Sequence, residues 1–268
     1  MILRTLFFIF VYIPVLLVCV PIQFVITRLG LFSPVLTMLF HRVGCTFLGL
    51  RVHVIGKPVQ GRPALLLSNH ISWTDIIAIG SVADVTFVAK QGVRRTFFVG
   101  FMATLQRTLF VDYNSRVDTK RSSTEMARRL AGNAAVLLFA EGHRDLGTHV
   151  QPFRSALVGA AQAAMRDGGA ADVAIQPVTI AYTHLQGLPV SRTERADISG
   201  LNARGFKQVV NNLLTSNVKD VTIAFGAPIA MDVGSDRKVV TRLAETQVRR
   251  MLVALNRHEK ELPPVFAG

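Results

Sequence analysis

An uncharged apolar run near the N-terminus constrains this chain more than any other feature. Between Arg4 and Arg28 lie 23 residues without a charged side chain. About 20 apolar residues suffice to cross the hydrocarbon core of a bilayer. A cleaved signal peptide usually has a shorter apolar stretch that ends in a small-residue site, whereas this run is longer and has no A-x-A site. We therefore expect a retained membrane segment, with Pro14 and Pro21 leaving a shallow or re-entrant insertion open.

The distribution of charge also favours a membrane partner. Residues 31–50 are mostly apolar and predict a second helix, in the interface or packed on the first, and the first acidic residue is Asp75. The formal net charge of +13 suits nucleic acid, an acidic substrate or an anionic lipid surface. The chain has no recognisable nucleic-acid module, so we expect a lipid bilayer and no nucleic acid as partner. The positive-inside tendency predicts the inner membrane, with the basic body facing the cytoplasm.

After residue 50, short apolar runs alternate with helical periods. Strands are expected at residues 51–55, 64–68, 85–89, 108–111, 135–139, 174–181 and 220–225, and helices near 73–82, 94–105, 118–131, 155–166, 204–216 and 236–256. This alternation predicts an α/β fold with a mixed, largely parallel sheet flanked by helices. Residues 183–203 have weak periodicity and are expected to form an extended loop, and 261–268 a frayed tail. We divide the chain into an N-terminal membrane anchor, 1–50, and a second domain, 51–268.

The segment SNHISWTDI follows an apolar strand and opens a predicted helix. Its polar side chains therefore lie at the carboxyl end of a strand, where sites form in open α/β sheets. His70 and Asp75 are separated by four residues across this turn. An imidazole there can take a proton from an alcohol while the carboxylate fixes its tautomer. By itself, the pair fits equally a solvated loop histidine beside a helix-capping aspartate.

Several blocks together resemble the glycerolipid acyltransferase family that includes bacterial 1-acylglycerol-3-phosphate acyltransferases. The family's NHxSxxD motif is matched by Asn69, His70, Ser72 and Asp75. Its FPEGTRS motif is similar to residues 139–145, FAEGHRD, which again follow an apolar run. Downstream, residues 153–156 resemble F-K-x-G, and 176–178 resemble a later proline-containing strand motif. The order and spacing of these blocks agree with the family over residues 50–230.

The resemblance implies acyl transfer without a covalent enzyme intermediate. His70 would remove the proton of the acceptor hydroxyl and Asp75 would orient His70, so that the oxygen attacks an acyl thioester. Acyl-CoA or acyl carrier protein would be the co-substrate, a lyso-lipid the acceptor, and no cofactor or metal is expected. Arg144 would grip an anionic head group. Glu141 would orient the loop or bind a substrate hydroxyl, and Gly142 would admit a close backbone approach; the plainer interpretation of Glu141 and Arg144 is a surface ion pair.

The sequence departs from the family pattern around the head-group positions. In the second motif, GxxFxxR, Arg107 stands where glycine is common and Tyr113 where arginine is frequent. Arg107 or Arg116 is the candidate for the missing positive charge. Lys90 is a further candidate for anion binding, or a solvated lysine at a strand end. In the third motif Ala140 and His143 replace proline and threonine, which bears on the acceptor head group more than on the reaction.

The sequence favours one function and leaves two alternatives. The favoured function is acylation of 1-acyl-glycerol-3-phosphate at its sn-2 hydroxyl, giving phosphatidic acid in phospholipid biosynthesis. The first alternative is O-acylation of lyso-ornithine lipid by the same residues, and the second is a membrane-binding relative that has lost activity. The chain has no G-x-S-x-G, GxxxxGK[ST] or HExxH motif, which argues against the commonest serine hydrolase, phosphate-loop and zinc sites.

Overall fold

The computed structural model describes residues 6–31, 33–112, 116–167, 170–201 and 218–259. The apolar N-terminal run forms one continuous helix, which starts as the π-helical turn η1 (Phe8–Tyr12) and continues as α2 (Ile13–Arg28). Among the described residues, this is the helix long and apolar enough to cross a membrane, judged by length and composition. Pro14 directly follows the π-helical turn and Pro21 lies inside α2, and the helix continues through both, although each proline lacks the N–H that a helical hydrogen bond needs.

The second apolar segment also forms a helix, α3 (Pro34–Leu48). The Ser33 hydroxyl accepts a hydrogen bond from the Leu36 N–H at its start, and Gly49 ends it with a φ of 66°. The helix packs against both α2 and α4 (Thr74–Gly80); packing on the first helix is one of the two arrangements expected for this segment. His41 is fully buried there, and burial lowers its pKa to about 4, so its imidazole is neutral at physiological pH.

The sheet is mixed and largely parallel, as predicted. Its strands are β1 (Leu50–Ile55), β2 (Ala64–Ser68), β3 (Thr86–Lys90), β4 (Leu109–Val111), β5 (Ala135–Phe139), β6 (Val173–Leu185), β7 (Leu188–Pro189), β8 (Lys219–Phe225) and β9 (Ile229–Met231). The order along the sheet is β1-β8-β6-β2-β5-β3-β4, with β7 and β9 paired to β6. The pairs of β6 with β7, β8 and β9 are antiparallel and the others are parallel. Strand β2 therefore lies in the middle, between β5 and β6.

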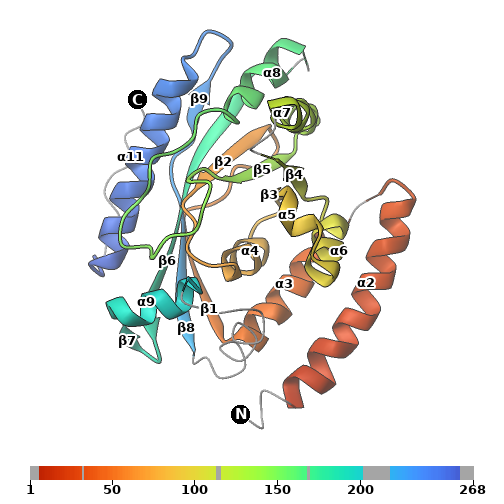
Figure 1. Cartoon of the computed structure of the whole chain (residues 1–268), viewed down its shortest axis with the longest axis vertical. Helices are drawn as coiled ribbons and strands as arrows, with labels where there is room; N and C mark the ends of the chain where they lie inside the picture. Colours follow the sequence, from red (N-terminus) through yellow and green to blue (C-terminus); the bar gives the residue numbers. More distant parts are fainter. Residues whose placement is uncertain (1–5, 32, 113–115, 168–169, 202–217, 260–268) are drawn as a thin grey trace.

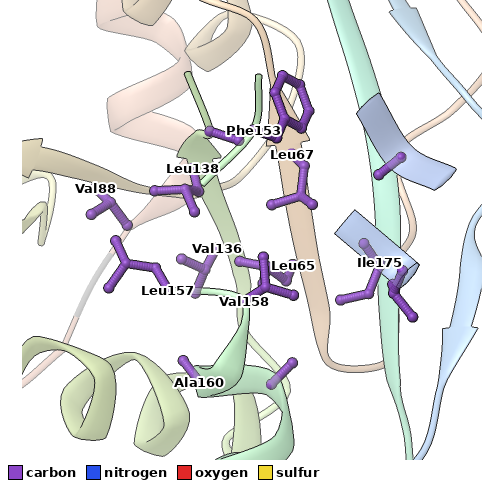
Figure 2. Packing of buried hydrophobic residues seen from close by; sticks show 14 of the residues in the cluster. Leu65, Leu67, Val88, Val136, Leu138, Phe153, Leu157, Val158, Ala160 and Ile175 are labelled. Carbon is purple, nitrogen blue, oxygen red and sulfur yellow. The ribbon is translucent and has the colours of Figure 1, made fainter. Parts of the chain in front are cut away.

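Helices cover both faces of the sheet, and the alternation of β2 side chains shows how. Leu65 and Leu67 pack into one cluster with α7 (Arg116–Ala131), α8 (Gly159–Asp167) and α11 (Arg237–Asn256) (Figures 1 and 2). Leu66 faces the other way, into a cluster with α3, α4 and α9 (Arg192–Ser199). All three leucines are fully buried. A strand without a polar face is expected where helices cover both sides of a parallel sheet.

Two expectations about local structure need correction. The predicted helix 94–105 is split into α5 (Gln91–Arg94) and α6 (Phe97–Leu105). Residues 183–203 are not an extended loop: β6 continues to Leu185 and α9 follows after the short strand β7. A capping box starts α9, because the Ser191 side chain accepts from the Glu194 N–H while the Glu194 carboxylate accepts from the Ser191 N–H. The predicted helix 204–216 and the tail 261–268 lie outside the described residues.

Candidate active site

The NHxSxxD segment forms the turn that joins β2 to α4, at the carboxyl edge in the middle of the sheet. Ser68, the last residue of β2, is paired with Phe139 on β5 and Val178 on β6. The Asn69 amide extends the sheet with its side chain, since its Nδ2 donates to the Ile180 carbonyl and its Oδ1 accepts from the Ile180 N–H, both at 3.0 Å. This pair of hydrogen bonds fixes the start of the turn, so the next residue, His70, leaves the sheet in a defined direction.

His70 and Asp75 meet across this turn. The His70 Nδ1 lies 2.8 Å from Asp75 Oδ2, and the Asp75 side chain is fully buried while that of His70 is 17% exposed. A carboxylate accepts hydrogen bonds and does not donate them, which assigns the proton to Nδ1 and leaves Nε2 as the basic nitrogen. This is the tautomer that a general base needs in order to take a proton from an alcohol.

The Asp75 carboxylate is held by more than the histidine. Its Oδ2 also accepts from the backbone N–H groups of Ile71 at 2.7 Å and Ser72 at 3.0 Å. Its Oδ1 accepts from the Tyr182 hydroxyl at 2.8 Å, and Thr74 Oγ1 lies 2.6 Å from the same hydroxyl. A buried charge is tolerated when such donors surround it. Both oxygens are therefore fixed, and the orientation of His70 is fixed with them.

The loop after β5 (residues 140–158) holds His70 from its other side. The His70 ring stacks on Phe139 with 4.0 Å between ring centroids. The backbone N–H of His70 donates to Glu141 Oε2 at 2.7 Å, and the Asp145 N–H donates to the His70 carbonyl at 2.9 Å. Residues of the FAEGHRD motif thus hydrogen-bond to the backbone N–H and carbonyl of His70 in the NHxSxxD motif.

Glu141 orients the loop, one of the two roles expected for it. Its Oε2 holds the His70 N–H and its Oε1 accepts from the Gln151 N–H at 2.8 Å, and the side chain is buried. Burial raises the pKa of Glu141 to about 7, with smaller increases from the charges of Asp145 and Asp75, although the two backbone N–H bonds lower it. The alternative of a surface ion pair with Arg144 is excluded, because the carboxylate is inside and bonds to backbone.

The other residues of the third motif line the loop. Gly142 has a φ of 76°, and a Cβ there would lie 2.9 Å from the Arg154 Cζ. This position needs glycine for its backbone conformation and for the close approach of Arg154. Arg144 is half-buried, and its Nη1 donates to the Ser199 carbonyl at the end of α9 at 3.0 Å. The Ser72 hydroxyl donates to the neighbouring Ile198 carbonyl at 2.8 Å, so α9 fastens both motifs from one side.

Lys90 and Arg107, the two other residues predicted to bind substrate, do not lie in the turn or the loop that surrounds His70. Lys90 ends β3 at the carboxyl edge, where it is exposed, and β5 lies between β3 and β2. Arg107 precedes β4 and borders a cavity of about 780 Å³ at the opposite, amino edge of the sheet. Its Nη2 donates to the Gly30 carbonyl at 3.2 Å. Because β3 and β4 are parallel, a residue before β4 and a residue after β3 lie at opposite edges, which separates Arg107 from the site.

Two residues that hold the site together were not singled out from the sequence. Tyr182 donates to Asp75, and Gln151 links Glu141 to Asp145, which was noted only as part of a motif. A buried tyrosine usually needs a hydrogen-bond partner, so the polar residue in the apolar run of β6 was a usable signal for Tyr182. Gln151 bonds Glu141 through its backbone N–H, which no side-chain pattern reveals.

Comparisons with known proteins identify the family. The family model described as Acyltransferase matches residues 50–181. The chain is 40% identical over 213 residues to the lyso-ornithine lipid O-acyltransferase of Brucella abortus, a match that covers 80% of each chain. It is 36% identical to the protein of the same description from Rhizobium meliloti, over 80% of this chain and 73% of that one. Identity to the 1-acyl-sn-glycerol-3-phosphate acyltransferase of Neisseria meningitidis is 31%, over 65% of this chain and 66% of the relative.

The fold is that of a solved acyltransferase. The crystal structure of the 1-acyl-sn-glycerophosphate acyltransferase PlsC from Thermotoga maritima matches with a TM-score of 0.64 over 98% of each chain, at 20% identity. Together with the sequence relatives, this places the chain plainly in the glycerolipid acyltransferase family. Its similarity extends both to lyso-ornithine lipid O-acyltransferases and to 1-acyl-sn-glycerol-3-phosphate acyltransferases.

Proposed function

We propose that this protein transfers a fatty acyl chain from a thioester to the hydroxyl of lyso-ornithine lipid. The reaction is supported above all by the His70–Asp75 pair, with a 2.8 Å hydrogen bond at Nδ1 and a free basic nitrogen at Nε2. The acceptor is supported by the relatives with the highest identities reported above, 40% and 36%. It is also supported by Tyr113, which occupies the position where the family pattern often has a phosphate-binding arginine.

The mechanism follows from the tautomer of His70. The acceptor hydroxyl binds at Nε2 and gives its proton to the imidazole as its oxygen attacks the thioester carbonyl. Asp75 stabilises the imidazolium that results. The carbon–sulfur bond then breaks, the thiolate leaves, and His70 returns the proton to the sulfur. An ester and a free thiol are the products, and no covalent intermediate forms on the enzyme.

The N-terminal helices supply the membrane association in this proposal. Leu17, Val18 and Val25 on α2 are more than half exposed, as is Phe97 on α6, which packs beside α2. Arg94 and Arg95 precede the exposed rings of Phe97 and Phe98. This arrangement suits the membrane interface, where cations lie at the lipid head groups and rings lie at the acyl chains. We propose that residues 1–50 anchor the domain 51–268 to the cytoplasmic face of the inner membrane, where acyl-CoA or acyl carrier protein delivers the donor chain.

Acylation of 1-acyl-glycerol-3-phosphate is the second candidate. Its support is the pair of arginines on the third-motif loop, Arg144 and Arg154, since guanidinium groups match phosphate geometry. The Arg144 Nη1 is already bonded to the Ser199 carbonyl, which reduces what this arginine can offer to a phosphate.

A competition assay tests the choice between the two acceptors. Membranes that contain the full-length protein receive one labelled acyl thioester with lyso-ornithine lipid and lysophosphatidic acid at equal concentration, and His70→Ala is the matched control. We expect His70-dependent label in ornithine lipid. His70-dependent label in phosphatidic acid alone would replace the acceptor by the second candidate, and label that does not depend on His70 would overturn the proposed reaction.

A further inference from the structure

The cavity of about 780 Å³ at the amino edge of the sheet is rich in guanidinium groups. Among the described residues, four arginines and one carboxylate line it: Arg62, Arg107, Arg128, Arg129 and Asp84. Its volume lies in the usual range of small-ligand pockets, about 300–1,000 Å³. Guanidinium groups match the geometry of phosphate, so this lining favours an anionic ligand that carries a phosphate group.

Three of these arginines lie together at the ends of two neighbouring helices. Glu125 accepts from both Arg128 Nη2 at 2.8 Å and Arg129 Nε at 3.2 Å, so one carboxylate serves two guanidinium groups. Arg129 Nη1 donates to the Arg107 carbonyl at 3.0 Å. Burial lowers the pKa of the Arg107 guanidinium, and the charge of Arg129 lowers it further, which shows that the two cations repel each other. An anion bound between them would offset this repulsion.

Arg107 occupies a backbone position that normally suits glycine. Its N–H donates to the Thr104 carbonyl at the end of α6, and its φ is 56°. The next N–H, that of Thr108, donates to the Ala103 carbonyl. This pair of hydrogen bonds is the common way for a helix to end at glycine, and the family pattern has glycine at this position. A positive φ costs free energy for a residue with a Cβ, so an arginine here points to a role for its side chain.

Apolar surface of the N-terminal helices borders the cavity. Arg107 Nη2 donates at 3.2 Å to the Gly30 carbonyl, in the turn between α2 and α3 (Figure 1). Met38 on α3 lines the cavity itself. The same face of α3 carries Val35 and Leu39, which are 73% and 43% exposed. Guanidinium groups beside exposed apolar side chains suit a membrane lipid, because its phosphate and its acyl chains meet the two surfaces in turn.

We propose that this cavity binds the phosphate of an anionic membrane lipid, whose acyl chains lie along the exposed face of α3. The site is separate from the acceptor site, since His70 lies at the opposite edge of the sheet. The inference therefore does not depend on the choice between the two acceptors. A lipid bound here holds the domain to an anionic leaflet at one defined point, in addition to the apolar contacts of α2.

The test measures lipid binding by the full-length protein in detergent. The single tryptophan, Trp73, reports thermal unfolding while phosphatidylglycerol, phosphatidylcholine or inorganic phosphate is added at constant ionic strength. We expect saturable stabilisation by phosphatidylglycerol and little by the other two. The double variant Arg107→Gln/Arg129→Gln should bind phosphatidylglycerol about tenfold or more weakly, because hydrogen bonds between charged groups have this strength. The control, Lys238→Gln/Arg242→Gln, removes two exposed charges from α11 and should keep the wild-type affinity.

Four results would each overturn the proposal. Equal stabilisation by phosphatidylcholine would show that any lipid suffices, and an equal loss in the control variant would show that general surface charge binds the lipid. Inorganic phosphate that stabilises as strongly as phosphatidylglycerol would assign the cavity to a free anion. Wild-type affinity in Arg107→Gln/Arg129→Gln would mean that these arginines serve only the helix ends. If the double variant does not fold, Arg107→Gln alone is judged by the same criterion.

Discussion

The two edges of the central sheet hold charged side chains in opposite ways. At the carboxyl edge, Asp75 is fully buried and accepts four hydrogen bonds, and Glu141 is buried with both oxygens bonded to backbone. At the amino edge, the pair Arg62–Asp172 is 41% and 46% exposed. The cavity of about 780 Å³ that Arg62 borders lies at this edge, away from His70.

This difference shows that a site is defined by how its charges are held, and not by the size of the nearest cavity. Exposed ion pairs typically contribute about 0–1 kcal/mol to stability and leave their side chains free to move. A buried carboxylate with several hydrogen-bond donors is held in one orientation. Its hydrogen bond to His70 then fixes the orientation of the imidazole ring. The carboxyl edge therefore has the geometry that proton transfer needs, whereas the amino-edge cavity is lined by arginines and one carboxylate, Asp84, and by no histidine.

Glu141→Gln gives the largest effect among changes that leave the catalytic pair intact. A neutral amide has one accepting oxygen, so either the His70 N–H or the Gln151 N–H faces an NH₂ group and loses its partner. We expect kcat to fall about 10- to 100-fold, because an unsatisfied buried donor costs about 1–3 kcal/mol. Steady-state kinetics with saturating donor measure the change. A loss confined to KM would contradict the role of Glu141 in holding His70.

The titration of Glu141 predicts a pH-dependent difference in stability between the wild type and the same variant. Burial raises the folded-state pKa of Glu141 to about 7, above its ordinary value of 4.5. The unfolded chain therefore loses this proton first as pH rises, and stability from this group is present at low pH and lost as pH rises through 7. We expect the free energy of unfolding of the wild type to fall relative to that of Glu141→Gln between pH 4.5 and about pH 7, and to stay level above that range. Urea unfolding at several pH values measures this difference, and a constant difference would show that Glu141 does not titrate there.

Tyr182→Phe is expected to have a smaller effect. Burial and the charge of Asp75 raise the pKa of Tyr182 well above its ordinary value, so the hydroxyl remains a donor throughout the working pH range. Its loss removes one donor from Asp75 Oδ1 and leaves the bonds at Oδ2 in place. We expect kcat to fall about tenfold with little change in KM, from the usual strength of a bond to a charged group. Equal kcat in the two proteins would mean that the bonds at Oδ2 alone orient Asp75.

Arg62→Ala should have almost no effect, which makes it the matched comparison from the other edge. Its partner Asp172 is solvated, so breaking the 3.1 Å pair leaves no buried charge. We expect unchanged kcat and KM and a free energy of unfolding within about 1 kcal/mol of the wild type. A tenfold loss of activity would show that the amino edge takes part in the reaction, and the contrast between the two edges would then be wrong.

The sequence predicted the elements of the fold that have strong local signals. The seven predicted strands are confirmed, because runs such as residues 64–68 and 135–139 are continuous and apolar. Helix α9 was missed although Ser191 and Glu194 carry its capping-box signal, since its apolar periodicity is weak. The strands β7 and β9 have two and three residues, too few for any periodicity to show.

The residues of the candidate site that belong to sequence motifs could be predicted, whereas the contacts that hold these residues in place could not. Two motifs directly follow β2 and β5, whose carboxyl ends lie at the same edge of the sheet, and they predicted His70, Asp75, Glu141 and Gly142 as site residues. Arg107 was expected to bind substrate because it aligns with the second motif of the family. It precedes β4, which is parallel to β3, so it lies at the amino edge of the sheet and not at the carboxyl edge with His70. The holding of Asp75 by Tyr182 links positions that are 107 residues apart, a distance that no local pattern spans.

A double-mutant cycle tests whether the His70 and Asp75 side chains act together as one general base. Acyl transfer is measured under single-turnover conditions for wild type, His70→Ala, Asp75→Asn and the double variant, each checked for wild-type elution and circular dichroism. We expect each single change to lower the rate by about 10³- to 10⁴-fold and the double change to lower it little further, because residues that act as a unit are non-additive. If the two losses multiply, or if the His70→Ala enzyme keeps a tenth of the wild-type rate, the two side chains do not act as one general base.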